Sequence, residues 1–372
     1  MKKVSNKPIR ILQIGMHDKI GGVETFLMNY YRNIDKKKFQ FDFINPYEKL
    51  SFQEEIEKLG GKVYKIPNFK KHPIKYYKAI KNIIKNNKYN IVHVHMLSAA
   101  NVLPIKAAKS CDVKHIISHS HNSNTPPGVI RKILNMVNKK YIRHTCNHFL
   151  GCSLLASEWL YGAKFCKNNN IIVINNAIDY DKFCYNDSVR KKIREQLKVD
   201  NELLFGHVGR FSYQKNHNYL IELFNEIHKA NPKTKLILIG DGELRKKIEL
   251  KVNDYNLQKS VIFLGVVSNV NDYFQAMDVF LLPSWFEGLP VVGVEAQISS
   301  TKCVFSSTIT KEIDITNNNL FIDINNDAKD NAKNILNFAK KEKNIVSRRN
   351  VSQYDIQKES KKLESFYKDI SD

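Results

Sequence analysis

The chain has 372 residues, of which 42% are hydrophobic and 26% charged, a composition typical of a globular protein and not of a disordered or fibrous one. This length predicts two domains, because a single core seldom serves more than about 250–300 residues. The six cysteines form no C-x-x-C pair and no Cys/His ligand spacing, which excludes a zinc-finger or disulfide framework and fits a reducing cytosol. No apolar run reaches about 18 residues, so neither a signal peptide nor a membrane span is predicted.

The net charge of +22 lies almost entirely in the first half of the chain. Residues 1–185 carry 31 Lys and Arg against 12 Asp and Glu, whereas the remainder carries 28 against 25. A one-sided excess indicates that this half faces an anionic partner, either nucleic acid or a membrane surface. Lys and Asn are abundant throughout, so codon bias is a second source of the excess.

Strands and helices alternate along the first half with the rhythm of a doubly wound parallel sheet. Strands are predicted at 9–14, 39–44, 63–66, 91–94, 115–118, 149–152 and 171–174. Helices are predicted near 25–34, 52–59, 74–86, 99–110 and 128–143. Gly21 and Gly22 stand between the first strand and its helix, where small residues let a ligand approach the backbone. The loop lacks the G-x-G-x-x-G spacing, which weakens a dinucleotide-oxidoreductase interpretation.

Polar residues follow the fifth strand, in the order His119-Ser120-His121-Asn122. The carboxyl ends of parallel strands are where open α/β folds bind ligands. An imidazole there can donate a hydrogen bond to a sugar hydroxyl or to developing charge, so we favour a site role over a structural one. The stretch offers no third metal ligand, so no metal is predicted at the end of this strand.

Two predicted helices of the first half carry basic residues at helical spacing. The first, near 74–88, has Lys75, Lys78, Lys81, Lys85 and Lys88, and the second, near 128–143, has Arg131, Lys132, Lys139, Lys140 and Arg143. Ordinary surface helices explain both patterns. The alternative is peripheral docking on anionic lipid, for which basic faces are the expected feature.

The triplet Asp179-Tyr180-Asp181 has the D-x-D form that holds a divalent metal on a diphosphate in some sugar-transfer enzymes. Its own turn chemistry explains both aspartates, and the polar segment 186–201 follows directly. We therefore predict no metal here and place a domain boundary after residue 185.

The second half repeats the pattern, with strands at 203–208, 236–239, 261–264 and 278–282. Each strand leads into a loop with ligand-type residues, namely Arg210 with Lys215, Gly240-Asp241-Gly242, Val266-Val267 and Glu287-Gly288-Leu289. Two cations neutralise a diphosphate, carboxylates suit hydroxyls, and the Gly288 and Leu289 amides precede a helix that begins near Pro290 and carries Glu295. Four such loops in succession predict a ligand site at this edge of the sheet.

Taken together, these stretches resemble the retaining GT-B glycosyltransferases of family 4, especially the bacterial exopolysaccharide and capsule branch. The resemblance rests on Gly21-Gly22-Val23-Glu24, the His-Ser-His-Asn stretch, the Asn-Ala-Ile-Asp turn, Gly209-Arg210-Phe211 with Lys215, Gly240-Asp241-Gly242, and the E-x7-E of Glu287 and Glu295. It implies two facing Rossmann-like α/β domains with parallel sheets. The acceptor domain would span residues 1–185, the nucleotide-sugar domain 186–349, and a last helix, 350–372, would cross back to the first.

The resemblance also implies roles for single residues. Arg210 and Lys215 would bind the donor diphosphate, Glu295 the ribose hydroxyls, and Glu287 with the Gly288 and Leu289 amides the transferred sugar. Gly240, Asp241, Val266 and Val267 would complete the donor site, the last two near the base. Gly21 and Gly22 would approach the phosphates, His121 would reach the sugar, and His119 and Asn122 are candidate acceptor contacts. Retention implies front-face transfer in which the departing diphosphate helps to deprotonate the acceptor, so no protein nucleophile is expected. No metal or other cofactor is expected either.

The function expected from these features is transfer of a hexose or N-acetylhexosamine from a UDP-sugar to a lipid-diphosphate-linked glycan. The enzyme would be cytoplasmic and attached peripherally to the anionic inner face of the cell membrane. A nucleotide-sugar epimerase or hydrolase with the same fold is the first alternative. A nucleic-acid-binding protein is the second, but it needs stacking aromatics or a known reading element, and neither occurs.

Overall fold

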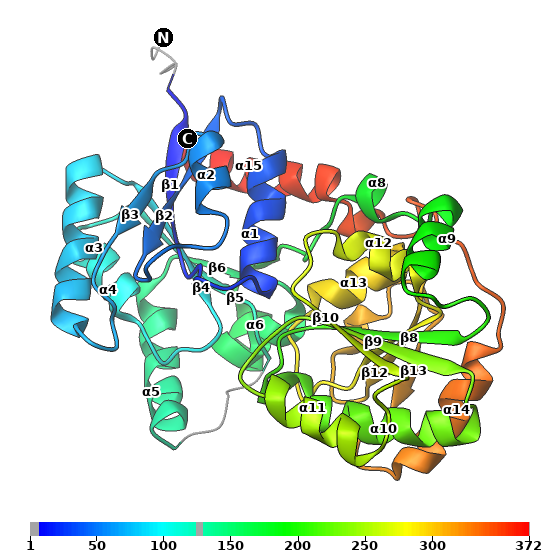
Figure 1. Cartoon of the computed structure of the whole chain (residues 1–372). Helices are drawn as coiled ribbons and strands as arrows, with labels where there is room; N and C mark the ends of the chain where they lie inside the picture. The colour runs from blue at the N-terminus through cyan, green and yellow to red at the C-terminus, as the bar shows by residue number, and fades with distance from the viewer. Residues whose placement is uncertain (1–6, 124–128, 372) are drawn as a thin grey trace. The chain divides into compact units, whose positions relative to one another are not determined.

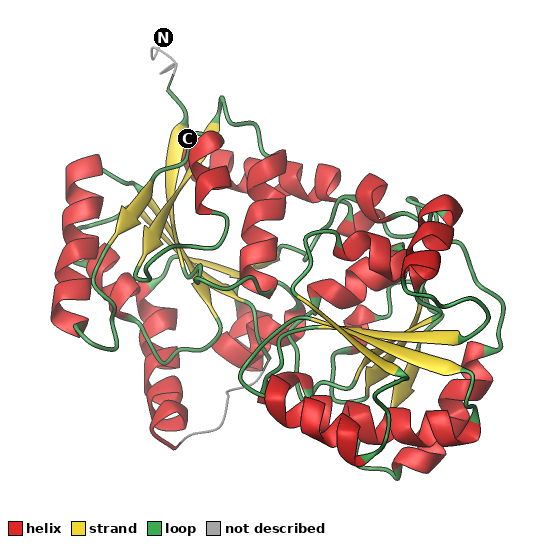
Figure 2. Ribbon diagram, in the orientation of Figure 1, coloured by secondary structure: helices red, strands yellow, loops and turns green. Residues whose placement is uncertain are grey.

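The computed structural model of the chain describes residues 7–123 and 129–371. Its internal contacts divide the chain into two units, Met1–Ala177 with Ile356–Asp372, and Ile178–Asp355. Each unit is a parallel sheet with helices packed against it (Figures 1 and 2). The expected pair of Rossmann-like domains is therefore confirmed. Within the part of the chain that the structure describes, no helix is both long and apolar enough to span a membrane.

The first unit holds a seven-stranded sheet in the order β3-β2-β1-β4-β5-β6-β7. Its strands are β1 (Ile9–Ile14), β2 (Phe39–Asn45), β3 (Val63–Lys65), β4 (Ile91–Met96), β5 (His115–Ser120), β6 (His148–Gly151) and β7 (Ile171–Val173). Its helices are α1 (Gly22–Asn33), α2 (Gln53–Lys58), α3 (Pro73–Asn87), α4 (Leu103–Lys109), α5 (Val129–Thr145), α6 (Leu154–Tyr161), α7 (Ala163–Asn168) and α15 (Ile356–Ser371). Successive residues of β1, such as Ile11 and Leu12, enter two different cores, one on each face of the sheet.

The second unit holds a six-stranded sheet in the order β10-β9-β8-β11-β12-β13. Its strands are β8 (Leu203–Val208), β9 (Thr234–Ile239), β10 (Val261–Gly265), β11 (Val279–Leu282), β12 (Lys302–Ser306) and β13 (Leu320–Ile322). Its helices are α8 (Tyr180–Phe183), α9 (Asp187–Gln196), α10 (His217–Ala230), α11 (Arg245–Asp254), α12 (Val270–Ala276), α13 (Val291–Ile298) and α14 (Ala328–Ala339), with short 3-10 turns at Tyr213–Lys215, Lys311–Ile313 and Ser352–Tyr354.

The contacts place the domain boundaries a few residues from the predicted positions. Ile178 donates its backbone N–H to the carbonyl of Tyr354 (2.9 Å), and Gln275 donates to the carbonyls of Phe183 and Cys184. These bonds attach residues 178–185 to the second unit, so the boundary lies after Ala177 and not after 185. The crossing segment begins at Ile356, where α15 starts and packs against α1 of the first unit.

In each sheet the strand order reverses at one point, between β1 and β4 in the first unit and between β8 and β11 in the second. The loops that leave the two strands at such a point diverge to opposite sides, which leaves a crevice at their carboxyl ends. The predicted loops of Gly21-Gly22, of Arg210 with Lys215 and of Glu287 all leave these strands.

Candidate functional site

The centre of the site in the second unit is an ion pair at the β8/β11 reversal. Lys215 follows β8, Glu287 follows β11, and Lys215 Nζ lies 2.7 Å from Glu287 Oε1. The side chains are only 16% and 10% exposed, so the pair is largely withdrawn from water. The structure thus brings together Lys215, assigned from the sequence to the donor diphosphate, and Glu287, assigned to the transferred sugar.

The local chain conformation explains how Lys215 reaches this position. A 3-10 turn over Tyr213–Lys215 ends at Asn216, whose φ of 53° is left-handed and is better tolerated by Asn than by most residues. Asn216 also accepts a hydrogen bond from the backbone N–H of Tyr219 (3.4 Å) and so caps α10. The turn and the cap together fix the loop that carries Lys215.

Gln214 is a site residue that the sequence prediction missed. Its side-chain amide donates to Glu287 Oε2 (3.1 Å) and to the carbonyl of Phe286 (2.9 Å). The backbone carbonyl of Gln214 accepts a hydrogen bond from the backbone N–H of Trp285 (2.9 Å). Gln214 therefore ties the β8 and β11 loops together. Its place directly before Lys215 was the available signal, but nothing in the sequence pairs it with a residue 73 positions later.

Arg210 and the glycine turn lie beside the pair on the same edge of the sheet. Arg210 pairs with Glu243 (3.0 Å), and both side chains are about half exposed. Gly240 has a φ of +132°, and a Cβ there would lie 2.1 Å from the carbonyl oxygen of Gly209, so only glycine fits. The adjacent Asp241 accepts the backbone N–H of Gly242 (2.7 Å), so its carboxylate stabilises the turn.

The remaining predicted donor residues have different surroundings. Glu295 is 6% exposed on α13, and burial raises its pKa to about 7, against a smaller opposing effect of Lys182. Val266, 71% exposed, and Val267 follow β10 at the edge of the sheet. Gly288 and Leu289 lie just before α13, whose N-cap is Pro290.

In the first unit, the Gly21-Gly22 turn opens α1, with Gly21 as its N-cap. Both glycines are exposed, and a Cβ on Gly22 would meet no atom within 4 Å. Beside them Glu24 is buried, and its Oε1 accepts the backbone N–H of His17 (2.9 Å) and lies 3.0 Å from His17 Nδ1. Since packing does not require glycine at position 22, the open space there is available to a ligand.

The predicted histidines belong to a larger cluster that the sequence prediction recognised only in part. His93 and His95 of β4 lie on the same face as His119 and His121, with ring centroids 4.2–5.3 Å apart between stacked or tilted neighbours. Their spacing of two along β4 was the missed signal, because alternate residues of a strand share a face. The rings connect further to Gln13 of β1 and Tyr367 of α15.

Two of the predicted contact residues are buried. His119 is 0% exposed and Asn122 is 4% exposed, and their contact with an acceptor stays a prediction. Burial, together with the neighbouring imidazoles, keeps the pKa of His93, His95 and His119 well below the ordinary value. His121 is the partly exposed member, and burial lowers its pKa to about 3.

Two arrangements bear on metal binding. Among the described residues, His93, His95 and His119 bring three ring nitrogens within 4.8 Å of one another, a geometry that could hold an ion, although these rings also take part in the hydrogen bonds of the cluster. Asp179 of the D-x-D triplet caps α8 by accepting the N–H of Asp181 (3.1 Å), as its turn chemistry predicts. Asp181 pairs with Arg348 (3.2 Å).

Comparison with known proteins covers both units. Residues 20–182 match the family model described as Glycosyltransferase Family 4, and residues 189–358 match the model described as Glycosyl transferases group 1. EpsF of Bacillus subtilis (strain 168) is 32% identical over 312 residues, which cover 82% of this chain and 81% of that protein. A UDP-Gal:alpha-D-GlcNAc-diphosphoundecaprenol alpha-1,3-galactosyltransferase from Escherichia coli is 30% identical over 62% of this chain and 60% of its own length.

Among solved structures, HepE from Anabaena in complex with UDP-glucose superposes with a TM-score of 0.79. The superposition covers 97% of this chain and 99% of HepE, at 17% sequence identity. A likeness at that identity establishes the fold, which is GT-B.

Proposed function

Since the chain belongs to glycosyltransferase family 4, we propose that it transfers a hexose or N-acetylhexosamine from a UDP-sugar to a lipid-diphosphate-linked glycan in exopolysaccharide or capsule synthesis. The observation that carries the proposal is the Lys215–Glu287 pair, held by Gln214 at the β8/β11 reversal. The Escherichia coli relative, whose name gives both a UDP-sugar donor and a diphosphate-lipid acceptor, supports the choice of substrates.

The charges of the second unit suit a nucleotide diphosphate. Lys215 and Arg210 would neutralise the diphosphate and stabilise it as it departs, while Glu287 accepts hydroxyls of the sugar and Glu295 those of the ribose. The Gly288 and Leu289 amides would add hydrogen bonds to the sugar, and Val266 and Val267 backbone contacts to the base. With side chains supplying the positive charge, transfer would need no metal, and a departing diphosphate oxygen would take the acceptor proton. The sugar would therefore keep its anomeric configuration.

The first unit would supply the acceptor side. Gly22 leaves open space at the start of α1, where backbone amides and the helix dipole favour a phosphate. His121, the partly exposed member of the histidine cluster, would meet a sugar hydroxyl.

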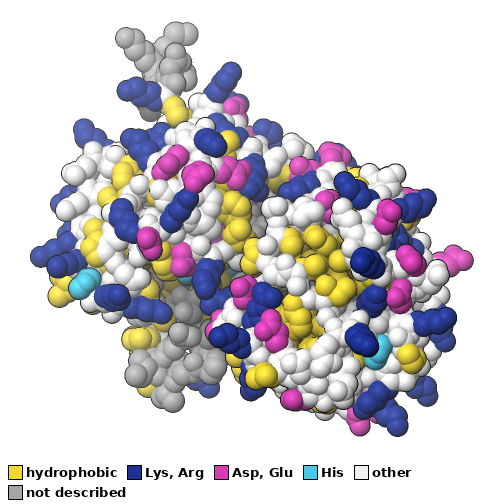
Figure 3. All heavy atoms as spheres, viewed as in Figure 1, with side chains coloured by type: hydrophobic (Ala, Val, Ile, Leu, Met, Phe, Trp, Pro, Cys, Tyr) yellow, Lys and Arg dark blue, Asp and Glu magenta, His cyan; other side chains and the backbone are white. Residues whose placement is uncertain are grey.

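Membrane attachment is the second part of the proposal, and the surface of the first unit supports it. Lys and Arg side chains spread over the side of the unit where α3 lies (Figure 3). On α5, the apolar residues Ile133, Leu134, Met136 and Val137 are 43–70% exposed, and Leu154 and Leu155 of α6 add to them. Exposed apolar side chains among basic ones are what an amphipathic helix needs to lie on anionic lipid.

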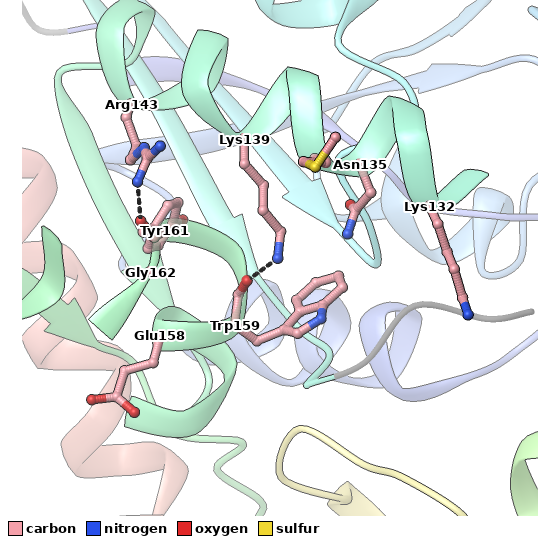
Figure 4. Close-up of a pocket in the computed structure, with 9 residues that line it drawn as sticks. Lys132, Asn135, Lys139, Arg143, Glu158, Trp159, Tyr161 and Gly162 are labelled. Carbon is pink, nitrogen blue, oxygen red and sulfur yellow. Dashed lines mark hydrogen bonds between the residues drawn. The ribbon is translucent and has the colours of Figure 1, made fainter. Parts of the chain in front are cut away.

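A pocket of about 580 Å³ between α5 and α6 belongs to the same region (Figure 4). Lys139 Nζ lies 4.5 Å from the centroid of the Trp159 ring, and Arg143 donates to the carbonyl of Tyr161 (3.1 Å). Lys132 extends along the same wall of the pocket. Basic groups of this kind suit the phosphates of lipid headgroups at the inner face of the cell membrane.

The experiment that tests the function is a screen of UDP-sugars with the purified chain. Donor hydrolysis without acceptor identifies the sugar, and addition of a diphosphate-lipid glycan should convert hydrolysis into transfer with retained anomeric configuration, read by NMR of the product. A nucleotide-sugar epimerase would instead release an isomerised donor when no acceptor is present. Failure of every UDP-sugar to react or bind would overturn the proposal.

A further inference from the structure

The histidine cluster forms one continuous hydrogen-bonded network with Gln13 and Tyr367. Parallel pairing sets Gln13 beside His93 and His95 beside His119, so these side chains share one face of the sheet. His95 Nε2 lies 2.8 Å from Gln13 Oε1, and His95 Nδ1 lies 2.8 Å from His121 Nε2. A second series of hydrogen bonds begins at Tyr367, whose Oη lies 2.7 Å from His93 Nδ1, and continues from His93 Nε2 to His119 Nδ1 over 3.1 Å.

Burial fixes the number of protons in the network. The pKa of each of the four imidazoles is lowered by burial, so each ring is neutral and carries a single N–H. Burial likewise raises the pKa of Tyr367, which keeps its phenolic proton. Every hydrogen bond between two rings therefore needs one donor and one acceptor nitrogen. Once one ring nitrogen is known to donate, the roles of the nitrogens bonded further along the network follow.

Gln13 determines which nitrogen of His95 donates. Its carbonyl Oε1 only accepts, so His95 must donate from Nε2 and must present a lone pair at Nδ1. His121 must then donate from Nε2 to His95, which leaves His121 Nδ1 as a lone pair. The amide Nε2 of Gln13 donates to Tyr367 (3.2 Å), and Tyr367 in turn donates to His93 Nδ1, so both ends of the Gln13 side chain agree with this arrangement.

We propose that Gln13 and His95 hold His121 in the Nε2–H tautomer, so that its Nδ1 accepts a hydrogen bond from a hydroxyl of the bound carbohydrate. The ligand class rests on the proposed function, whereas the tautomer does not. His93 and His95 are 1% and 7% exposed and His119 is fully buried, so the partly exposed His121 is where the network meets a ligand. The donor role expected for His121 from the sequence becomes an acceptor role, and Gln13 and His95 become positioning residues.

The first test reads the tautomer directly, in the full-length protein labelled with ¹⁵N-histidine. Two-bond ¹H–¹⁵N spectra distinguish Nε2–H from Nδ1–H imidazole, and a His121→Asn variant identifies the His121 signal. The expected result at neutral pH is a neutral Nε2–H ring at His121. A neutral Nδ1–H ring, or a charged one, would overturn the proposal whatever the enzyme's activity.

The second test removes the acceptor that orients the network. Gln13→Met keeps the volume but loses the carbonyl, and it should let His121 populate both tautomers and raise the KM for the sugar ligand about threefold to tenfold, with a smaller change in kcat. Gln13→Glu still accepts from His95 and should restore the wild-type tautomer and KM. Gln40→Met is the matched control, because Gln40 is a buried β2 glutamine that instead accepts from Tyr31 (2.6 Å).

The outcomes separate this inference from the proposed function. A His121 tautomer that is unchanged in Gln13→Met, or a KM that rises equally in Gln40→Met, would refute the positioning role. Absence of any UDP-sugar turnover in the wild-type chain would refute the proposed function but would leave the spectroscopic result to decide the tautomer.

Discussion

Lys215 Nζ and Glu287 Oε1 lie 2.7 Å apart although the two residues are 72 positions apart in the chain. The pair joins the loops that leave β8 and β11, the two strands between which the order of the sheet reverses. Gln214 holds the second carboxylate oxygen of Glu287 (3.1 Å), so the orientation of the carboxylate is fixed before a ligand arrives. Preorganised charge of this kind is what stabilises a departing diphosphate at little reorganisation cost.

Removal of either member of the pair should therefore abolish transfer. For Lys215→Ala and Glu287→Ala we expect turnover of the UDP-sugar to fall by about 100-fold or more, because the charge that stabilises the departing group or positions the sugar is lost. Steady-state kinetics measure the effect, and circular dichroism with a thermal melt establishes that each variant is folded.

Lys191→Ala provides the matched control. Lys191 pairs with Asp187 four residues earlier on α9, and both side chains are well exposed, at 79% and 57%. Exposed pairs of this kind contribute little to stability, so activity and melting temperature should stay at the wild-type values. Full activity in either Lys215→Ala or Glu287→Ala would show that the pair is structural only.

The sequence was sufficient to predict the parallel strands of the first unit, because buried strands are continuous apolar runs between turn residues. It did not reveal β12 and β13 of the second unit. Each has only three to five residues, and β13 begins after the polar run Asn317-Asn318-Asn319. Strands this short show too few residues for their hydrophobic pattern to be distinguished from that of a loop. The place of β12 in the sheet is set by its pairing with β11, and that of β13 by its pairing with β12, which are long-range contacts.

The site could be predicted as a set of loops but not as a set of contacts. Parallel topology places the carboxyl ends of strands together, so Lys215 and Glu287 could be assigned to one edge from sequence alone. Local sequence patterns do not predict the hydrogen bonds between Gln214 and Glu287 or between Gln13 and His95, because these bonds depend on strand order and register. The complete burial of His119 likewise depends on the tertiary packing and not on a local pattern.

Glu295 should make the stability of the chain depend on pH. Burial raises its pKa from the ordinary value of 4.5 to about 7, so the folded state holds a proton that the unfolded state loses at lower pH. Stability is thus fully present below pH 4.5 and falls as the pH rises to about 7, by up to about 3 kcal/mol from this group. Glu295→Gln should remove this part of the pH dependence and stabilise the chain at pH 8.

Denaturant titrations of the wild type and of Glu295→Gln at pH 5 and pH 8 measure this difference. The variant should gain free energy of unfolding relative to the wild type at pH 8 and show a smaller difference at pH 5. The same loss of stability with rising pH in both proteins would assign the effect to another group.

Membrane binding should depend on the exposed apolar residues of α5 and on the basic residues beside them. Met136→Glu and Val137→Glu should each weaken sedimentation with vesicles that contain anionic phospholipid, since 70% and 61% of these side chains are exposed. Lys140→Glu should lower the binding constant about fivefold to tenfold on such vesicles, and raised salt should reduce the effect.

Leu250→Glu serves as the control for surface charge, because Leu250 is 63% exposed on α11 of the second unit. Its vesicle binding should equal that of the wild type. Equal binding to neutral and anionic vesicles, or equal loss in Leu250→Glu, would contradict docking through α5.

Transfer should persist in excess EDTA, because Lys215 and Arg210 supply the positive charge that a metal would otherwise bring to the diphosphate. Asp181→Asn should likewise retain turnover, since Asp181 pairs with Arg348 instead of standing free for a metal. Complete loss of activity in EDTA, restored by a divalent cation, would point to a metal at the D-x-D triplet or at the three histidines His93, His95 and His119.

Two glycine substitutions should separate packing from ligand approach. At Gly240, φ is +132° and a Cβ would lie 2.1 Å from the Gly209 carbonyl oxygen, so Gly240→Ala should destabilise the fold by about 1–3 kcal/mol or more.

At Gly22 a Cβ would meet nothing within 4 Å, and alanine suits the first position of a helix better than glycine does. Gly22→Ala should therefore melt at or slightly above the wild-type temperature and still turn over substrate more slowly, because the added methyl group occupies space that the ligand needs. Wild-type kinetics in Gly22→Ala would show that no ligand approaches this turn.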